Sequence, residues 1–287
     1  MRMGRLMKRA IVLYILLIFV YAADSSPVVK VDPVYEEIKL AAIESGIPDY
    51  FIRKAFSNDS IQIHAEIPER FARPYEKQTW AEYKKLFVTG ARIKKGTVFY
   101  NEHQEDLKKA ARHYGVDPYL ILSIIGVESN YGSHHKEFSV FNSLYTQIAV
   151  MPQRARWAKK EMVEFLTYCY KDKVLPHNVY GSYAGAFGYG QFIPSSFNNF
   201  AVDFDKDGVR QAYAWPDVMA SIANYLVANG YPVTQDTDMD LEKKNQEKIY
   251  KAVFAYNHAD NYVKAILELR KELRNSISFM KINSSHQ

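Results

Sequence analysis

The stretch Pro118–Gly132, PYLILSIIGVESNYG, decides the fold and carries the first candidate for chemistry. Asp117 followed by Pro118 is typical of a helix start, because Asp caps free N–H groups and Pro lacks an N–H that would be unpaired there. The apolar residues that follow predict a helix buried on most sides. Gly132 allows this helix to end.

Glu128 is a carboxylate on the apolar face of this helix. It shares that face with Ile121 and Ile124, because residues three and four positions apart lie on one side. Burial is expected to raise the pKa of Glu128, as a general acid near neutral pH requires. The alternative is a glutamate at a fraying helix end that turns to solvent.

Helical periodicity recurs along the chain, and no repeating strand pattern does, so we expect a mainly α protein with little β structure. The stretch after residue 57 is expected to be irregular, with a brief extended piece at Ile61 and Ile63, and a frayed tail is expected from Ser276. Further helices are predicted over residues 33–44, 48–56, 77–87, 102–114, 155–171, 216–229, 246–256 and 261–273.

The first residues are typical of an export signal. A basic segment with Arg2, Arg5, Lys8 and Arg9 precedes an uncharged run over residues 10–23. We therefore predict a signal peptide over residues 1–22 and a periplasmic location. An uncleaved inner-membrane anchor is the alternative, although the run is short against the roughly 20 residues of a spanning helix. No Cys follows the run, which excludes a lipid-modified N-terminus.

Charge and cysteine content exclude other classes. The chain has 37 Lys and Arg against 32 Asp and Glu, a net charge of +5, and removal of residues 1–22 would leave +1. A nucleic-acid partner therefore loses its electrostatic support. Cys169 is the only cysteine, so no intramolecular disulfide forms, and its place in an apolar helical stripe indicates a buried, inert thiol.

Two further stretches offer contacts for a carbohydrate. Residues 181–190, GSYAGAFGYG, lack the Gly-Lys-Ser/Thr of a phosphate loop and the preceding strand of a dinucleotide site. Glycines there let the backbone approach a bulky ligand, and a tight irregular turn is an equal alternative. Residues 255–262, AYNHADNY, carry aromatic and amide side chains between two helices. His258 has no partner at metal-ligand spacing.

The stretch DFDKDGVRQAYAWPD, residues 203–217, begins like a calcium loop. Asp203, Asp205 and Asp207 alternate as oxygen ligands do, and Val209 would supply its carbonyl. The usual Glu at the twelfth position is missing, and Asp217 is a substitute in an expanded loop. A solvated acidic turn is the alternative, but carboxylates this close repel one another unless a cation neutralises them.

Five motifs together resemble the membrane-bound lytic transglycosylase B family of lytic murein transglycosylases, glycoside hydrolase family 103. The resemblance covers nearly all of the chain after the export signal. It is carried by GVESNYG at 126–132, GSYAGAFGYGQFIPSSF at 181–197, AVDFDKDG at 201–208, WPDVMASIANYL at 215–226 and AYNHADNY at 255–262.

The resemblance implies a mainly α, lysozyme-like catalytic core that cleaves peptidoglycan glycan strands. It implies that residues 101–275 form this core, that 23–100 are N-terminal helices packed on it, and that 276–287 are a flexible tail. It also implies a structural Ca²⁺ in the loop with Asp217. We expect a monomer, and the charge balance argues against a nucleic-acid partner. Glu128 would be the single catalytic acid/base. The substrate-binding residues it implies are Ser182, Gln191, Tyr256, Asn257, Tyr131, Arg154, Tyr225 and Tyr262.

Three functional hypotheses follow. A lytic transglycosylase cleaves the bond between N-acetylmuramic acid and N-acetylglucosamine with one carboxylate and leaves a 1,6-anhydro end. A muramidase would use water on the same glycan, and glycosidases of that kind usually need two carboxylates. A glycan-binding cell-wall protein would cleave nothing. The sequence favours the first, because Glu128 is the one carboxylate that the motifs place in an apolar setting.

Overall fold

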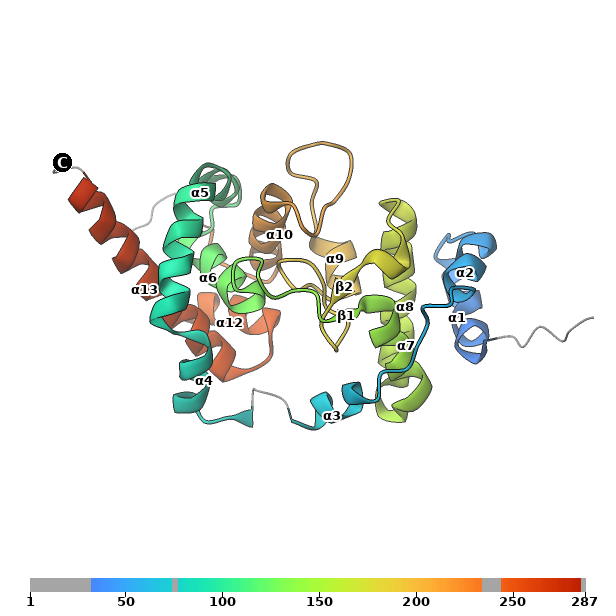
Figure 1. Cartoon of the computed structure of the whole chain (residues 1–287). Coiled ribbons are helices and arrows are strands. Elements are labelled where there is room, and N and C mark those ends of the chain that lie inside the picture. Colours follow the sequence, from blue (N-terminus) through green and yellow to red (C-terminus); the bar gives the residue numbers. More distant parts are fainter. Residues whose placement is uncertain (1–31, 74–76, 234–243, 285–287) are drawn as a thin grey trace, which may run out of the picture. The chain divides into compact units, whose positions relative to one another are not determined.

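The structure is a computed structural model that describes residues 32–73, 77–233 and 244–284. Helices dominate it, which confirms the predicted mainly α class (Figure 1). In chain order the elements are α1 (Pro33–Glu44), α2 (Asp49–Phe56), α3 (Glu66–Ala72), α4 (Trp80–Phe87), α5 (Gly90–Tyr114), α6 (Pro118–Ser129), β1 (Phe138–Ser139), α7 (Val140–Val150), α8 (Pro152–Lys171), the 3₁₀ turn η2 (Pro176–Asn178), β2 (Tyr180–Gly181), α9 (Pro194–Phe200), α10 (Trp215–Ala228), α12 (Gln246–Tyr256) and α13 (Asp260–Ser284).

The strands β1 and β2 form a short antiparallel pair, with Phe138 opposite Gly181 and Ser139 opposite Tyr180. This pairing joins the chain that leaves α6 to the start of the glycine-rich segment. β structure is therefore small in the described part of the chain, as expected, but it connects two of the motifs singled out in the sequence.

The helix α6 lies at the centre of the hydrophobic core. It packs against α5, α10 and α13 (Figure 1), and its residues from Leu120 to Val127 are buried. Asp117 caps it by accepting a hydrogen bond from the N–H of Tyr119, at 2.9 Å. The helix ends at Ser129, earlier than the predicted stop at Gly132, because Asn130 already adopts the left-handed conformation.

A buried ion cluster fastens the start of α6 to α13. The carboxylate of Asp117 lies 2.5 Å from the Nε of Arg270 and 2.6 Å from a terminal nitrogen of Arg274. The side chains of Asp117 and Arg270 are 6% and 8% exposed, so both charges are removed from water and depend on each other. Arg270 and Arg274 are four residues apart and therefore reach Asp117 from one face of α13.

The sequence did not predict α3 and α7. The stretch over residues 57–74 contains α3 rather than only irregular chain, and Ile61 and Ile63 form no strand in the described structure. In α7, polar residues interrupt the apolar pattern but are buried because they are hydrogen bonded: Ser143 Oγ donates to the carbonyl of Ser182, and Gln147 Nε2 donates to the carbonyl of Ser143.

Two other helices extend beyond their predicted bounds. α5 begins at Gly90 and kinks at His103, close to the predicted start at 102, so the domain boundary expected at residue 100 lies inside one helix. α13 continues to Ser284, and the frayed tail expected from Ser276 is wrong up to that residue. Ile277 is buried and the hydroxyls of Ser276 and Thr97 lie 3.1 Å apart, since this part of α13 packs against α5.

The predicted signal peptide or anchor over residues 1–22 lies outside the described residues. Within residues 32–73, 77–233 and 244–284, no helix combines the length and the apolar character that a membrane span requires.

Replacing Asp117 by Ala should lower the free energy of unfolding by about 3–5 kcal/mol, because it removes the buried carboxylate that Arg270 and Arg274 both contact. Urea denaturation measures this loss. The matched control is Asp32→Ala. Asp32 caps α1 before a proline in the same way, but its other oxygen accepts from the hydroxyl of Tyr145 rather than from an arginine. The control should lose about 1 kcal/mol, and equal losses in the two variants would contradict the role given to the ion cluster.

Candidate active site

Glu128 lies in the last turn of α6 and is half-buried. Its carboxylate accepts a hydrogen bond from the hydroxyl of Tyr262, at 2.5 Å. Tyr262 stands in the first turn of α13 and is 1% exposed. Burial, followed by the charge of Glu128, raises the pKa of Tyr262 well above its ordinary value. Tyr262 therefore keeps its proton and acts as a donor to Glu128.

Tyr256, the last residue of α12, brings a second motif to the same place. Its ring lies parallel to that of Tyr262, with centroids 6.4 Å apart. Its hydroxyl donates to the carbonyl of Gly190, at 2.5 Å. Burial, followed by the charge of Glu128, raises the pKa of Tyr256 well above its ordinary value. The structure thus gathers α6, the end of α12, the start of α13 and the glycine-rich segment around one carboxylate.

Tyr225 and Asn257 occupy the edge of this arrangement. The ring of Tyr225 meets that of Tyr256 edge to face at 4.8 Å, and its hydroxyl donates to the carbonyl of Ala255, at 2.7 Å. Tyr225 therefore holds the last turn of α12 in place. Asn257 caps that helix in an extended conformation, and its carbonyl accepts from the N–H of Ala259, at 2.7 Å.

The turn after Glu128 is tightly constrained. Asn130, Tyr131 and Gly132 all have positive φ angles, of 47°, 55° and 79°. Two of them are not glycine, and such conformations cost free energy that the surroundings must offset. The hydroxyl of buried Ser129 accepts from the N–H of Gly132 at 3.1 Å and lies 3.2 Å from the carbonyl of Ile125. This turn fixes where Glu128 stands relative to the chain that follows.

Tyr131 points into the core. Its ring packs against that of Phe99, with centroids 5.4 Å apart. A Cβ atom at Gly96 or Gly126 would lie 2.2 Å or 2.6 Å from its hydroxyl oxygen, so only glycine leaves room for that group. The buried hydroxyl has no hydrogen-bond partner among the described residues. Its surroundings are therefore those of a packing residue, whereas the sequence suggested a substrate contact.

The glycine-rich segment is a folded turn held by its own backbone. A Cβ atom at Gly181 would lie 2.0 Å from the carbonyl oxygen of Ala186, which explains why glycine stands there. Ser182 donates its N–H to that carbonyl at 2.8 Å and accepts the N–H of Ala186 on its hydroxyl at 3.2 Å. Gln191 has a positive φ of 50° and donates its side-chain amide to the carbonyl of Gly188, at 2.8 Å.

Arg154 lies in the first turn of α8 and is joined to the glycine-rich segment indirectly. Its guanidinium lies over the rings of Phe71 and Trp157, at 4.1 Å and 4.5 Å from their centroids, and burial lowers its pKa. Its Nε donates to Gln147 Oε1 at 2.9 Å, and Gln147 Nε2 donates in turn to the carbonyl of Tyr183, at 3.3 Å. The sequence gave no signal for Gln147, because it stands in the unpredicted helix α7.

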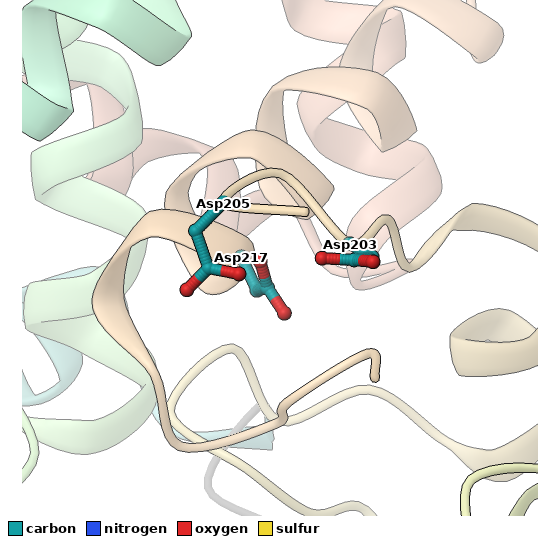
Figure 2. Close-up of side chains that lie close together, drawn as sticks. All are labelled: Asp203, Asp205 and Asp217. Atoms are coloured by element: carbon teal, nitrogen blue, oxygen red, sulfur yellow. The ribbon is translucent and has the colours of Figure 1, made fainter. Parts of the chain in front are cut away.

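Three of the predicted metal ligands come together. Asp203, Asp205 and Asp217 each offer a carboxylate oxygen, and these atoms lie within 4.8 Å of one another (Figure 2). Asp217 accepts the N–H groups of Phe204 and Gln211, at 2.7 Å and 2.8 Å. Burial raises the pKa of Asp217, its backbone hydrogen bonds lower it, and the charge of Asp205 raises it further.

Asp207 does not join this group. One of its oxygens accepts from the N–H of Val209 at 2.9 Å, and the other accepts from Gln211 Nε2 at 2.5 Å. The two central residues of the predicted calcium loop, Asp207 and Val209, are thus paired with each other through the side chain of Asp207. The three remaining carboxylates are the oxygen set that a hard divalent cation fits.

A family model described as "Transglycosylase SLT domain" matches residues 30–249. The chain belongs to this transglycosylase family. The matched range includes α6 with Glu128, the glycine-rich segment and the carboxylate cluster, and it ends inside α12, before Tyr256, Asn257 and Tyr262.

Similar proteins support this family assignment. Membrane-bound lytic murein transglycosylase B of Escherichia coli (strain K12) is 38% identical over 152 residues, which are 53% of this chain and 42% of that protein. The chain thus matches less than half of this relative's length. Soluble lytic transglycosylase SltB1 from Pseudomonas aeruginosa has a similar structure, with a TM-score of 0.75 and 27% identity, over 85% of this chain and 99% of that chain.

Lytic transglycosylase Slt35 of Escherichia coli, solved in complex with calcium, shares the fold as well. Its TM-score is 0.75 at 23% identity, over 86% of this chain and 94% of that chain. The fold of these lytic transglycosylases is thereby shown for this chain, as the family resemblance implied.

Replacing Tyr131 by Phe should leave the free energy of unfolding unchanged or raise it by about 1 kcal/mol, because a buried hydroxyl without a described partner is removed. Tyr225→Phe is the matched control. It removes a hydroxyl from another buried tyrosine, but that hydroxyl donates to Ala255, so a loss of about 1 kcal/mol is expected. Urea denaturation of both variants measures these changes. A clear loss of stability in Tyr131→Phe would show that the hydroxyl of Tyr131 forms a hydrogen bond.

Proposed function

We propose that the protein is a lytic murein transglycosylase that cleaves the β-1,4 bond between N-acetylmuramic acid and N-acetylglucosamine, with Glu128 as its single acid/base. The observation that carries the proposal is the carboxylate of Glu128, which Tyr262 holds at the meeting point of three family motifs. Membership of the transglycosylase family supports the substrate class. The surrounding tyrosines offer apolar faces on which sugar rings can pack.

The fully buried carboxylates of the described residues are engaged elsewhere. Asp117 is paired with arginines, Glu161 accepts the N–H and hydroxyl of Ser195, and Asp217 belongs to the carboxylate cluster. A hydrolase with two carboxylates flanking the bond therefore has less support than a mechanism with one.

One carboxylate suffices when the nucleophile belongs to the substrate. Glu128 donates its proton to the glycosidic oxygen as the bond from that oxygen to C1 of the muramic ring breaks, and the 2-acetamido group stabilises the developing cation. Glu128 then accepts the proton of the C6 hydroxyl while the oxygen of that hydroxyl bonds to C1. The product is a 1,6-anhydro ring, formed without water, and the positioned internal nucleophile replaces a second reactant.

Tyr262 supports both halves of this cycle. Its hydrogen bond orients the carboxyl group when Glu128 is the acid, and it offsets the negative charge once the proton has left. Because burial raises its own pKa well above the ordinary value, Tyr262 does not lose its proton to Glu128. The raised pKa of Glu128 expected from the sequence stays a prediction.

Contacts with substrate are proposed for residues around this centre. Gln191 and Asn257 would meet acetamido and hydroxyl groups, and the half-buried guanidinium of Arg154 would meet a carboxylate of the lactyl group or stem peptide. A periplasmic location, export by a signal peptide and a monomeric state belong to the same proposal and rest on the sequence pattern.

Glu128→Gln should lower the rate of peptidoglycan solubilisation by about 10²- to 10⁴-fold, because the amide neither donates nor accepts the catalytic proton. Mass spectrometry of digested sacculi should show anhydro products, one water lighter than reducing ends, from the unaltered protein. The control is Glu164→Gln, a half-buried glutamate of α8 that accepts from Asn198. Reducing ends alone would make the enzyme a hydrolase, and unchanged lysis by Glu128→Gln would show that Glu128 is not the acid. No lysis by the unaltered protein would leave a glycan-binding protein.

We also propose that Asp203, Asp205 and Asp217 hold a structural Ca²⁺. The donor set supports this, since three carboxylates within 4.8 Å repel one another without a cation. The calcium complex of the similarly folded Slt35 supports it as well. The metal would hold the loop between α9 and α10 and takes no part in the proton transfers.

Saturating Ca²⁺ at about 100 times its dissociation constant should stabilise the protein by about 2.7 kcal/mol, so an excess of chelator should lower the melting temperature by several degrees. Asp217→Asn should abolish this shift. Asp207→Asn should retain it, because Asp207 lies outside the cluster. A melting curve that does not respond to chelator would show that these residues form only an acidic turn.

A further inference from the structure

Trp215 stands between the carboxylate cluster and the glycan site. It is the first residue of α10, two positions before Asp217. Its ring stacks on that of Tyr189 in the glycine-rich segment, with centroids 4.1 Å apart and planes inclined by 19°. The same ring system and that of Phe99 in α5 meet edge to face, with centroids 4.6 Å apart. Trp215 is therefore fixed on two sides by aromatic partners.

The same ring packs on the turn that follows Glu128. A Cβ atom at Gly132 would lie 3.0 Å from Cζ2 of Trp215 and 3.2 Å from Cε1 of Tyr189. Gly132 in turn donates its N–H to Ser129, the neighbour of Glu128. A displacement of Trp215 would consequently reach the catalytic carboxylate through one constrained turn.

The chain just before Trp215 is fastened to the glycine-rich segment as well. Tyr189 donates its N–H to the carbonyl of Ala212, at 2.9 Å. Tyr213 donates its hydroxyl to the carbonyl of Tyr180, at 2.6 Å. A Cβ atom at Gly188 would lie 2.6 Å from the carbonyl oxygen of Ala212, so the two segments are in direct backbone contact.

The other end of this chain belongs to the carboxylate cluster. Asp217 holds the N–H groups of Phe204 and Gln211, so the position of its carboxylate decides the path of the loop on both sides. A cation that draws Asp203, Asp205 and Asp217 together would hold residues 211–217 in place. These residues include Ala212, Tyr213 and Trp215, which contact Gly188, Tyr180 and Tyr189.

We propose that Trp215 is a positioning residue that couples cation binding at Asp203, Asp205 and Asp217 to glycan binding along residues 182–191 and the Glu128 turn. The inference rests on the function proposed above. Ordering the loop places Tyr189 and the segment that ends in Gln191, and glycan bound to that segment orders the loop in return. The two ligands then raise each other's affinity by the same factor, as thermodynamic linkage requires.

Titration calorimetry with the Glu128→Gln variant, which does not turn over substrate, measures this factor. The Ca²⁺ dissociation constant is determined with and without a saturating tetrasaccharide of alternating N-acetylglucosamine and N-acetylmuramic acid. The tetrasaccharide should tighten Ca²⁺ binding by about fivefold or more, the range of coupled sites. Adding Trp215→Ala should leave Ca²⁺ binding in place and bring the ratio of the two Ca²⁺ dissociation constants, without and with tetrasaccharide, close to one. Trp215→Phe should restore most of this ratio, because it keeps the stack on Tyr189.

Trp80→Ala is the matched control, because Trp80 is also half-buried and also opens a helix, α4. It should keep the full ratio. A ratio of one in the variant with Trp215 intact overturns the coupling, while anhydro products from the unaltered protein would leave the proposed activity standing. A full ratio in Trp215→Ala overturns the role of Trp215, and a failure to bind Ca²⁺ overturns the coupling together with the metal site.

A second measurement does not depend on the folding of Trp215→Ala. The chain has three tryptophans, Trp80, Trp157 and Trp215, so Trp80→Phe combined with Trp157→Phe leaves Trp215 as the only indole. Its emission should change when Ca²⁺ is added and change again in the same direction when the tetrasaccharide follows. Emission that does not change on addition of Ca²⁺ would contradict the coupling.

Discussion

The antiparallel pair of α6 and α13 is held at both ends, and the site depends on that pairing. At one end Asp117 receives Arg270 and Arg274, and at the other Glu128 receives Tyr262. Compared with apolar residues of similar volume, the ion cluster adds little stability, because desolvation of its charges offsets their attraction, although removal of one partner is costly. Its main effect is on register: a shift of α13 by one turn would break the arginine contacts and carry Tyr262 about 5.4 Å away from Glu128.

Around this pair, backbone groups rather than flexible side chains shape the site. The carbonyl of Gly190 accepts from Tyr256, that of Gly188 accepts from Gln191, and that of Ala255 accepts from Tyr225. Main-chain acceptors lose little entropy when they bind, since the segment that carries them is already ordered. The glycine-rich segment thus fixes Tyr256 and Gln191, and in the proposed function it forms a wall for the bound glycan.

Strained backbone conformations lie close to Glu128, where neighbouring contacts offset their cost. Three consecutive positive φ angles, at residues 130–132, follow Ser129, and Gln191, directly after the glycine-rich segment, has another. Such conformations persist only when neighbouring contacts over-determine them. Ser129 provides these contacts on one side, and Trp215 with Tyr189 provides them against Gly132. Glu128, the proposed acid/base, therefore stands beside a turn that has little freedom to relax.

The sequence by itself determined the mainly α class, the start of α6 at Asp117 and Pro118, Glu128 as the candidate acid, and an acidic loop that ends at Asp217. These follow from caps, periodicity and residue spacing, which act over a few neighbouring positions. Only the tertiary structure decided that Tyr262, 134 residues away, donates to Glu128, and that Tyr131 turns into the core. It also decided that Asp207 lies outside the carboxylate cluster, and that α7 and the end of α13 are helical. Those outcomes depend on which helices pack together, because a hydrogen bond or a buried ring is stable only when a distant segment supplies its partner.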